Sequence, residues 1–258
     1  MTKPFLKWVG GKTQIIDAVL STFPEECDSY HEPFVGGGAV LLGMLSRGCR
    51  VKNKIYASDL NKTLIDLYKL VQSNPDKLIN GVTSYTTNGF TEDDYYKMRT
   101  EFNTDHDPIK FLILNKTCFR GLYREGPRGF NVPWGHYKKL SIMDENNIRE
   151  VSKLIQNVEF IWQSFEVSLN KVAMGDFVYM DPPYVGTFDT YTKSGFGSEK
   201  HNTLFDLTKK LPCPFVMSNS TDTVVLDSFK DYTIQTLVAR RAINSKNPGK
   251  TAQEVLIH

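Results

Sequence analysis

The sequence predicts an α/β fold in which a mostly parallel sheet is covered by helices on both faces. One reason is that strand-like apolar runs alternate with helix-like runs along much of the chain, which is typical of such a sheet. Another is the stretch SYHEPFVGGGAVLLGMLSRG, in which a short apolar strand runs to about Phe34, glycines follow at 36–38 and a helix-like run covers 39–45. A third is NKIYASDLN, a strand that ends at Asp59, 21 positions after Gly38.

This order of strand, glycine turn, helix, strand and acid is typical of folds that bind a nucleoside-like ligand. The ligand lies over the glycines, and the acid accepts hydrogen bonds from the ribose hydroxyls. The pattern here is Phe-x-Gly-Gly-Gly and lacks the complete Gly-x-Gly-x-x-Gly. The alternative is therefore a plain glycine turn between strand and helix, followed by an aspartate on the surface.

The remaining elements are assigned from the spacing of apolar residues. Helices are expected at residues 62–78, 91–103, 108–116, about 145–156 and 199–211. Strands are expected at residues 158–162, 176–181, 214–218, 232–240 and 254–257. Residues 115–139 lose the helical period and are rich in Gly, Pro, Arg and aromatic residues. We therefore expect one domain made of residues 1–60 and 158–258, and an inserted, mainly helical domain of residues 61–157.

The composition excludes several classes of protein. With 258 residues, 40% hydrophobic and 12% aromatic, the chain can bury a full core and is not mainly disordered. A net charge of +2 does not by itself indicate a nucleic-acid binder. The four cysteines and five histidines show no metal-ligand spacing, so we expect free thiols and no metal. Neither a membrane-spanning run nor a signal peptide is visible, so we expect a soluble, intracellular protein.

The amino-terminal stretch FLKWVGGKTQII contains Gly-Gly-Lys-Thr, which resembles the end of a phosphate-binding loop. Such a loop needs a glycine five positions before its Gly-Lys pair, because successive backbone N–H groups wrap the phosphates. That position is Leu6, and Pro4 stands where a buried strand would have to feed the loop. The sequence thus argues against a nucleotide triphosphatase and leaves Lys12 for another role.

The stretch GDFVYMDPPYVGTF carries the most specific chemistry. A strand delivers Asp181 to the carboxyl edge of the sheet, where open α/β folds bind ligands, and the two prolines that follow force a rigid loop. The Asp181 carboxylate and the Pro182 carbonyl can each accept one hydrogen of an exocyclic amine, while the ring of Tyr184 stacks on the base that carries it. The carboxylate also stabilises the positive charge that develops on the attacking nitrogen. A merely stiff turn is the alternative.

Six segments, in the same order, resemble the Dam-type DNA adenine methyltransferases: FLKWVGGK, EPFVGGGAV, ASDLN, RGFNVPWGHYKK, DPPY and RRAINS. The resemblance runs from about Phe5 to Ile257. It implies a Rossmann-like methyltransferase sheet with an inserted target-recognition domain, and direct transfer of a methyl group from S-adenosylmethionine to adenine N6 after base flipping, without a metal. Two rivals stay open. One is transfer to cytosine N4 or to an RNA adenine, and the other is a DNA-binding relative that has lost catalysis.

The resemblance also assigns cofactor contacts. The residues are Trp8, Lys12, Gly36, Gly38, Asp59 and Asp181, with Phe34 as a wall of the site. A lysine ammonium suits the methionyl carboxylate as a point charge, and glycines allow a close approach of the backbone. Phe34 has the alternative role of an ordinary core residue.

A local basic cluster is hidden by the small net charge. Residues 108–141 hold seven basic residues and one acid, Glu125. Four aromatic residues lie among them: Phe119, Tyr123, Phe130 and Trp134. Basic and aromatic residues on a Gly/Pro-rich hairpin suit insertion into a duplex from which one base is swung out. A solvated basic surface is the alternative.

By resemblance, this hairpin reads the target sequence. Arg124 is the first candidate for a guanine contact and Arg120 the second, because arginine binds guanine O6 and N7. Arg120 stands where the family usually has Asn, so the target GATC cannot be assumed. The residues expected to bind DNA are Lys116, Phe119, Arg120, Arg124, Arg128, Asn131 and Lys138, and, on a second basic segment, Arg240, Arg241, Asn244 and Lys246. The expected partners are double-stranded DNA and, functionally, a restriction nuclease, with the chain a monomer or weak dimer.

Overall fold

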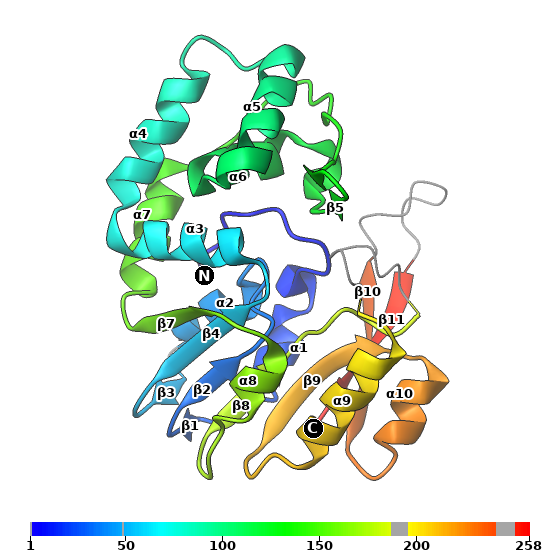
Figure 1. Cartoon of the computed structure of the whole chain (residues 1–258). Helices are drawn as coiled ribbons and strands as arrows, with labels where there is room; N and C mark the ends of the chain where they lie inside the picture. The colour runs from blue at the N-terminus through cyan, green and yellow to red at the C-terminus, as the bar shows by residue number, and fades with distance from the viewer. Residues whose placement is uncertain (1, 48, 187–195, 241–250) are drawn as a thin grey trace.

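The computed structural model describes residues 2–47, 49–186, 196–240 and 251–258, and a seven-stranded sheet lies at its centre (Figure 1). The strand order is β10-β11-β9-β8-β2-β4-β7. The bounds are β2 (Tyr30–Glu32), β4 (Ile55–Asp59), β7 (Val158–Trp162), β8 (Phe177–Met180), β9 (Phe215–Ser220), β10 (Ile234–Arg240) and β11 (Thr251–Ile257). Five adjacent strands, from β9 to β7, are parallel, whereas β11 is antiparallel to both of its neighbours.

The topology explains where a ligand binds. Counted along the chain, the five parallel strands lie in the order 3-2-1-4-5, as in Rossmann-like folds. The order reverses between β2 and β8, and the crevice outside the carboxyl ends of the strands at such a point is the usual ligand site. The predicted Rossmann-like α/β class is therefore confirmed.

Two minor sheets lie outside this main sheet. The first pairs β1 (Glu26–Cys27) with β3 (Arg50–Val51) in parallel. The second is an antiparallel hairpin of β5 (Glu125–Gly126) and β6 (Gly129–Phe130). This hairpin is the one predicted in the basic segment, and we call residues 123–131 the recognition hairpin.

The predicted helices lie in the predicted order, with one error, and the short helices at residues 16–20, 165–169 and 223–228 were not predicted. In chain order they are η1 (Lys12–Gln14), α1 (Ile16–Leu20), α2 (Ala39–Arg47), α3 (Lys62–Ser73), α4 (Pro75–Thr86), α5 (Glu92–Asp105), α6 (Pro108–Thr117), η2 (Phe119–Gly121), α7 (Glu145–Leu154), α8 (Phe165–Leu169), α9 (Ser198–Lys209) and α10 (Thr223–Ser228). The single helix expected at 62–78 is wrong, because the chain breaks at Asn74. Its side chain caps α4 through the Lys77 amide, and Pro75 occupies the first turn, where its missing N–H does no harm.

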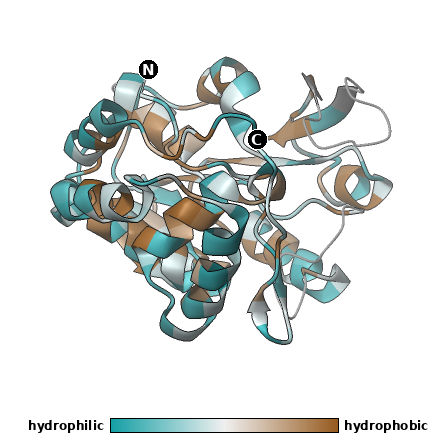
Figure 2. Ribbon diagram, turned by 90° about the horizontal axis from the view of Figure 1, so that it is seen from above, coloured by the Kyte–Doolittle hydropathy of each residue, from teal (hydrophilic) through white to brown (hydrophobic). Residues whose placement is uncertain are grey.

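The sheet is buried on both faces. In β8, Phe177 and Tyr179 join the core on the side of α2 and α3, whereas Val178 and Met180 join the core beneath α8, α9 and α10. Successive side chains of a strand point to opposite faces, so the continuous apolar run FVYM is what a central strand requires. Figure 2 shows the complementary pattern, since the outer turns of the helices are mostly hydrophilic.

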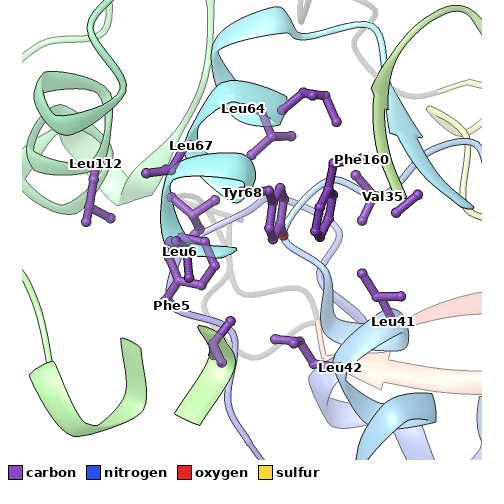
Figure 3. Close-up of a cluster of buried hydrophobic side chains, with 14 of the residues drawn as sticks. Phe5, Leu6, Val35, Leu41, Leu42, Leu64, Leu67, Tyr68, Leu112 and Phe160 are labelled. Carbon is purple, nitrogen blue, oxygen red and sulfur yellow. The ribbon is translucent and has the colours of Figure 1, made fainter. Parts of the chain in front are cut away.

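Helices α4, α5 and α6 and the recognition hairpin lie away from the sheet, and α3 and α7 lie between them and it (Figure 1). The core is nevertheless continuous: Tyr68 of α3 stacks on Phe160 of β7, with ring centroids 4.7 Å apart and planes 5° from parallel (Figure 3). The amino-terminal Phe5 packs against the same tyrosine. The division into residues 1–60 with 158–258 and an inserted 61–157 therefore stays a prediction.

Candidate active site

Three parallel strands end in, or directly before, a carboxylic acid. Glu32 ends β2, Asp59 ends β4 and Asp181 follows β8. Because these strands are parallel neighbours, their carboxyl ends meet at one edge of the sheet. This edge lies at the reversal of strand order, so the two acids singled out from the sequence, Asp59 and Asp181, lie at the predicted ligand crevice.

Lys12 is buried against the second of these acids. Its Nζ lies 2.7 Å from Oδ2 of Asp181 and donates to the Gly10 carbonyl at 2.6 Å, and the residue is only 3% exposed. The local turn that allows this uses Gly10 with φ of +78°. Gly-Gly-Lys-Thr therefore does not form a phosphate loop in this structure; it delivers an ammonium to the acid of the DPPY segment.

The carboxylate of Asp181 is tuned by opposing effects. Burial raises its pKa, the Lys12 ammonium acts in the opposite direction, and the nearby Glu254 carboxylate raises it again. Tyr184 donates its hydroxyl hydrogen to Oε2 of Glu254 at 2.9 Å, and its ring centroid lies 5.0 Å from the Lys12 Nζ. Lysine, two carboxylates and the tyrosine thus form one polar cluster.

The glycine turn is tied to Asp59. The Gly36 amide donates to one carboxylate oxygen at 3.0 Å, and the Asn61 amide donates to the other at 2.9 Å. Burial raises the Asp59 pKa, and these amide bonds act against that rise. The acid remains half-buried, so it is fixed in orientation and still reachable.

The glycines are required by protein neighbours. Gly36 and Gly38 have φ of +46° and +69°, which L side chains rarely adopt. A Cβ at Gly36 would lie 2.8 Å from Nε1 of Trp8, and one at Gly38 would lie 2.5 Å from the Tyr68 hydroxyl. The glycines were predicted to allow close approach of a ligand, and the structure adds close approach of two aromatic side chains.

Phe34 lies on the side of the sheet that α8 and α9 cover. It is half-buried, stacks on Phe165 with centroids 5.5 Å apart, and meets Phe196 edge-on at 5.9 Å. These contacts place it at the margin of the core beneath α8 and α9. Its assignment to the cofactor stays a prediction.

The predicted DNA-binding residues of the middle segment are mostly exposed. The exposed ones are Phe119, Arg120, Arg124, Arg128, Asn131 and Lys138. Phe119 is 41% exposed, and the Arg120 guanidinium lies 5.3 Å from its ring centroid. Lys116 is half-buried, and its burial, together with the neighbouring Lys7, lowers its pKa to about 8.

Two expectations about the basic segment are wrong. Phe130 and Trp134 are 3% and 8% exposed, so these aromatic rings belong to the core and cannot enter a duplex. Lys110 is also buried and pairs with Glu101 at 2.8 Å and Asp105 at 2.7 Å. Charge counting along the sequence could not see these acids, because they approach from α5.

Most of the second basic segment lies outside the residues that the structure describes. Arg240 ends β10, and its side chain lies outside the described part of the chain, as do the whole residues Arg241, Asn244 and Lys246. Their assignment to phosphate contacts stays a prediction.

The structure adds polar residues that the sequence analysis missed. Glu32 is 2% exposed and accepts a hydrogen bond from the Tyr30 hydroxyl at 2.6 Å. Burial raises the Glu32 pKa to about 8, against the effect of that hydrogen bond. Its position before the glycine turn is a signal that sequence reasoning could have used. Glu254 gave no such signal, because only the pairing of β11 with β9 brings it to the site.

An exposed apolar pair also lies beside Asp59. Leu60 is 58% exposed and Trp162 is 56% exposed, and the Trp162 indole donates to the Leu60 carbonyl at 3.0 Å. Leu60 follows β4 and Trp162 ends β7, so both lie at the carboxyl edge. A large exposed indole held in place beside a ligand crevice is suited to cover a planar ring.

The described residues contain neither a metal-binding cluster nor a membrane-spanning helix. Among the described residues, no three His, Cys, Asp or Glu side chains come together in a way that could hold a metal ion. Within these residues, too, every helix is too short or too polar to cross a bilayer.

The chain matches a known protein family and several known proteins in sequence. A family model described as D12 class N6 adenine-specific DNA methyltransferase matches residues 8–243. The Type II methyltransferase M.MjaIII of Methanocaldococcus jannaschii is 38% identical, over 95% of this chain and 93% of the relative. The DNA adenine methylase of Serratia marcescens is 30% identical over 99% and 97%, and that of Escherichia coli K12 is 30% identical over 98% and 92%.

Proposed function

This chain belongs to the D12 class of N6 adenine-specific DNA methyltransferases, and from that premise we propose that the cluster around Asp181 is its methyl-transfer site. The base that it holds is an adenine turned out of double-stranded DNA. The observation that carries the proposal is the 2.7 Å pair of Lys12 and Asp181 at the carboxyl edge of β8. It unites the amino-terminal GGK segment with the DPPY segment, 169 positions apart in the sequence.

The residues at this edge have the right chemistry for S-adenosylmethionine. Asp59 can accept hydrogen bonds from ribose hydroxyls, since a carboxylate has about four acceptor positions and backbone amides do not fill them all. Leu60 and Trp162 offer an apolar surface for an adenine ring beside it. Among the described residues, the carboxylates of Asp181 and Glu254 outnumber the one ammonium that lies within 4 Å of them, which favours a cationic ligand. When bound, the cofactor supplies a methyl group on a positively charged sulfur.

The chain's own residues prepare the amine. The Asp181 carboxylate and the Pro182 carbonyl accept the two N6 hydrogens, which leaves the nitrogen lone pair facing away from them. As N6 acquires positive charge, the carboxylate stabilises it more than it stabilises the neutral amine, and this difference lowers the barrier. Tyr184, whose hydroxyl is held by Glu254, presents its ring to the base.

Lys12 has a role beyond the one expected for it. Its ammonium opposes the effect of burial on the Asp181 pKa, so it favours the ionised form of the acceptor. The same bond fixes the carboxylate's orientation, which a hydrogen-bond acceptor for a flipped base needs. Lys12 therefore acts on the target amine through Asp181, in addition to any contact with the methionyl carboxylate.

We assign DNA recognition to the exposed face of the recognition hairpin and η2. Arg124 is the proposed reader of guanine and Arg120 the second, with Lys116, Arg128 and Lys138 as contacts to phosphates. Phe119, exposed at 41%, is the aromatic side chain available for insertion. The Type II names of relatives support a restriction–modification role, and a monomer or weak dimer remains our prediction for the assembly.

The test uses purified protein, unmethylated plasmid DNA and a labelled methyl donor. Nucleoside analysis of the digested product should give N6-methyladenine, and mapping of the modified bases should give the target sequence. Asp181→Ala should abolish transfer and leave DNA binding largely intact, whereas Asp206→Asn, on the exposed face of α9, should retain full activity. N4-methylcytosine, preferential labelling of RNA, or substantial turnover by Asp181→Ala would each contradict the proposal.

A further inference from the structure

Tyr123 joins the recognition hairpin to the cofactor segment. Its ring stacks on Trp8, with centroids 6.1 Å apart and planes 21° from parallel. It also meets Phe111 of α6 edge-on and packs on Phe130 of β6, both at 5.7 Å. Among the described residues, no other aromatic ring of the recognition hairpin stacks on Trp8. Tyr123 is therefore the aromatic bridge between the two.

Trp8 also lies close against the glycine turn. A Cβ at Gly36 would lie 2.8 Å from its Nε1, and a Cβ at Gly37 would lie 2.7 Å from its Cβ. Gly36 in turn donates its amide hydrogen to Asp59 at 3.0 Å. Trp8 thus contacts both the ring of Tyr123 and the glycine turn whose Gly36 amide binds the proposed ribose-binding acid.

The hydroxyl of Tyr123 strengthens the link to the hairpin. It donates to Oε1 of Glu125, the first residue of β5, at 2.5 Å. Burial raises the pKa of Tyr123, so the group stays protonated and remains a donor. The side chain of Asn61, two residues after Asp59, acts on the pKa of Tyr123 in the opposite direction.

The hairpin needs such an anchor. It pairs only two residues on each strand, Glu125 with Phe130 and Gly126 with Gly129, and a two-stranded hairpin of this size is marginal by itself. Asn103 of α5 holds one side through both backbone groups of Phe130, at 2.8 and 3.0 Å. Tyr123 holds the side that faces the cofactor, directly before the exposed Arg124.

We propose that Tyr123 is a positioning residue that links the two substrates, so that cofactor bound at Trp8 and Asp59 tightens DNA binding by the hairpin, and DNA tightens cofactor binding. The inference rests on the proposed function of both sites. A ligand that fixes Trp8 also restricts the ring stacked on it, and the second ligand then orders fewer groups when it binds. Linkage of this kind is reciprocal, with one factor for both ligands.

The experiment measures that factor with non-reactive S-adenosylhomocysteine and a duplex that contains the mapped target. The dissociation constant of each is determined alone and with the other at saturation, for wild type, Tyr123→Met, Tyr123→Phe and Tyr85→Met. Methionine fills similar space without a ring, and phenylalanine keeps the stack but loses the hydroxyl. Tyr85 is an exposed tyrosine of α4 and serves as the matched control.

We expect a factor of about fivefold or more in wild type, equal in both directions within error. It should fall to about one in Tyr123→Met and stay within about twofold of wild type in Tyr123→Phe and Tyr85→Met. A purely structural role would weaken both affinities and leave the factor unchanged, which would overturn the inference. A factor of one in wild type would overturn it as well, even if Tyr123→Met did not fold. Failure of wild type to bind either ligand would instead contradict the proposed function.

Discussion

Replacing Lys12 by methionine removes the only ammonium that the described residues place against Asp181. The pair is close, at 2.7 Å, and its lysine is 3% exposed while its acid is 21% exposed. An opposite charge at this distance lowers a carboxyl pKa, so its loss should raise the Asp181 pKa further. The acid retains some contact with water and can take up a proton. The loss of folding stability should therefore stay below the about 3–5 kcal/mol typical of a broken buried pair.

The predicted signature is a shift in the pH profile. Burial already raises the Asp181 pKa. The ionised acid is the stronger acceptor for an N6 hydrogen and the form that stabilises positive charge on N6, so activity falls as pH drops through this pKa. In Lys12→Met the acid limb of kcat should move to higher pH. Activity at pH 6 should thus fall more than activity at pH 8.5. The assay is methyl transfer at saturating cofactor and DNA between pH 5.5 and 9.

The control is Lys77→Met, which removes an exposed lysine of α4 that has no ion pair among the described contacts. Its profile should match wild type. An acid limb that stays in place in Lys12→Met, with kcat reduced equally at all pH values, would show that the Lys12 ammonium does not control the ionisation of Asp181. Lys12 would then act on the cofactor or on packing, and the ionisation of Asp181 would not depend on it.

Three further changes test other parts of the structure. Gly38→Ala should destabilise the protein by more than about 1 kcal/mol, measured by thermal unfolding, because its Cβ would meet the Tyr68 hydroxyl at 2.5 Å with φ at +69°. Asn131→Ala should reduce discrimination against single-base changes in the target by about tenfold, because its Oδ1 holds Nε of Arg124 at 2.7 Å. Glu32→Gln should gain stability relative to wild type as pH rises. The folded-state pKa is about 8 against an ordinary 4.5, so the stabilisation from Glu32 is present below 4.5 and lost as pH rises through 8.

Each change has its own comparison. Gly89→Ala introduces the same strain, at φ of +91°, with nothing within 4 Å, and an equal loss in both variants would exclude the clash at Gly38. Lys138→Ala should weaken binding to all sequences alike and reduce its salt dependence, so a similar result for Asn131→Ala would reassign Asn131 to a phosphate. Denaturant unfolding at pH 5 and 8 tests Glu32, with Glu199→Gln on exposed α9 as its control. A parallel offset at both pH values would rule out the titration.

Several features of this protein were already determined by short stretches of its sequence. Asp59 and Asp181 could be placed at strand ends because a strand, its apolar run and the turn that ends it are local patterns. The class of fold followed from the order of those patterns. Pro182 and Pro183 marked a rigid loop for the same reason. Even the error at Asn74 was a local one, since an Asn-Pro pair inside a helical period is a readable start signal for a second helix.

Which groups distant in the sequence come into contact depends on the tertiary structure. Nothing near Lys12 in the chain indicates that it pairs with Asp181, and nothing near Glu254 indicates that β11 returns it beside Tyr184. The burial of Phe130, an aromatic that matched the pattern of a DNA-inserting residue, was also decided by packing against another segment. Periodicity reports which face of an element is apolar, whereas pairing between elements depends on the positions of whole strands and helices in space. The polar cluster of the site and the stacking of Tyr123 on Trp8 both arise from this pairing between elements.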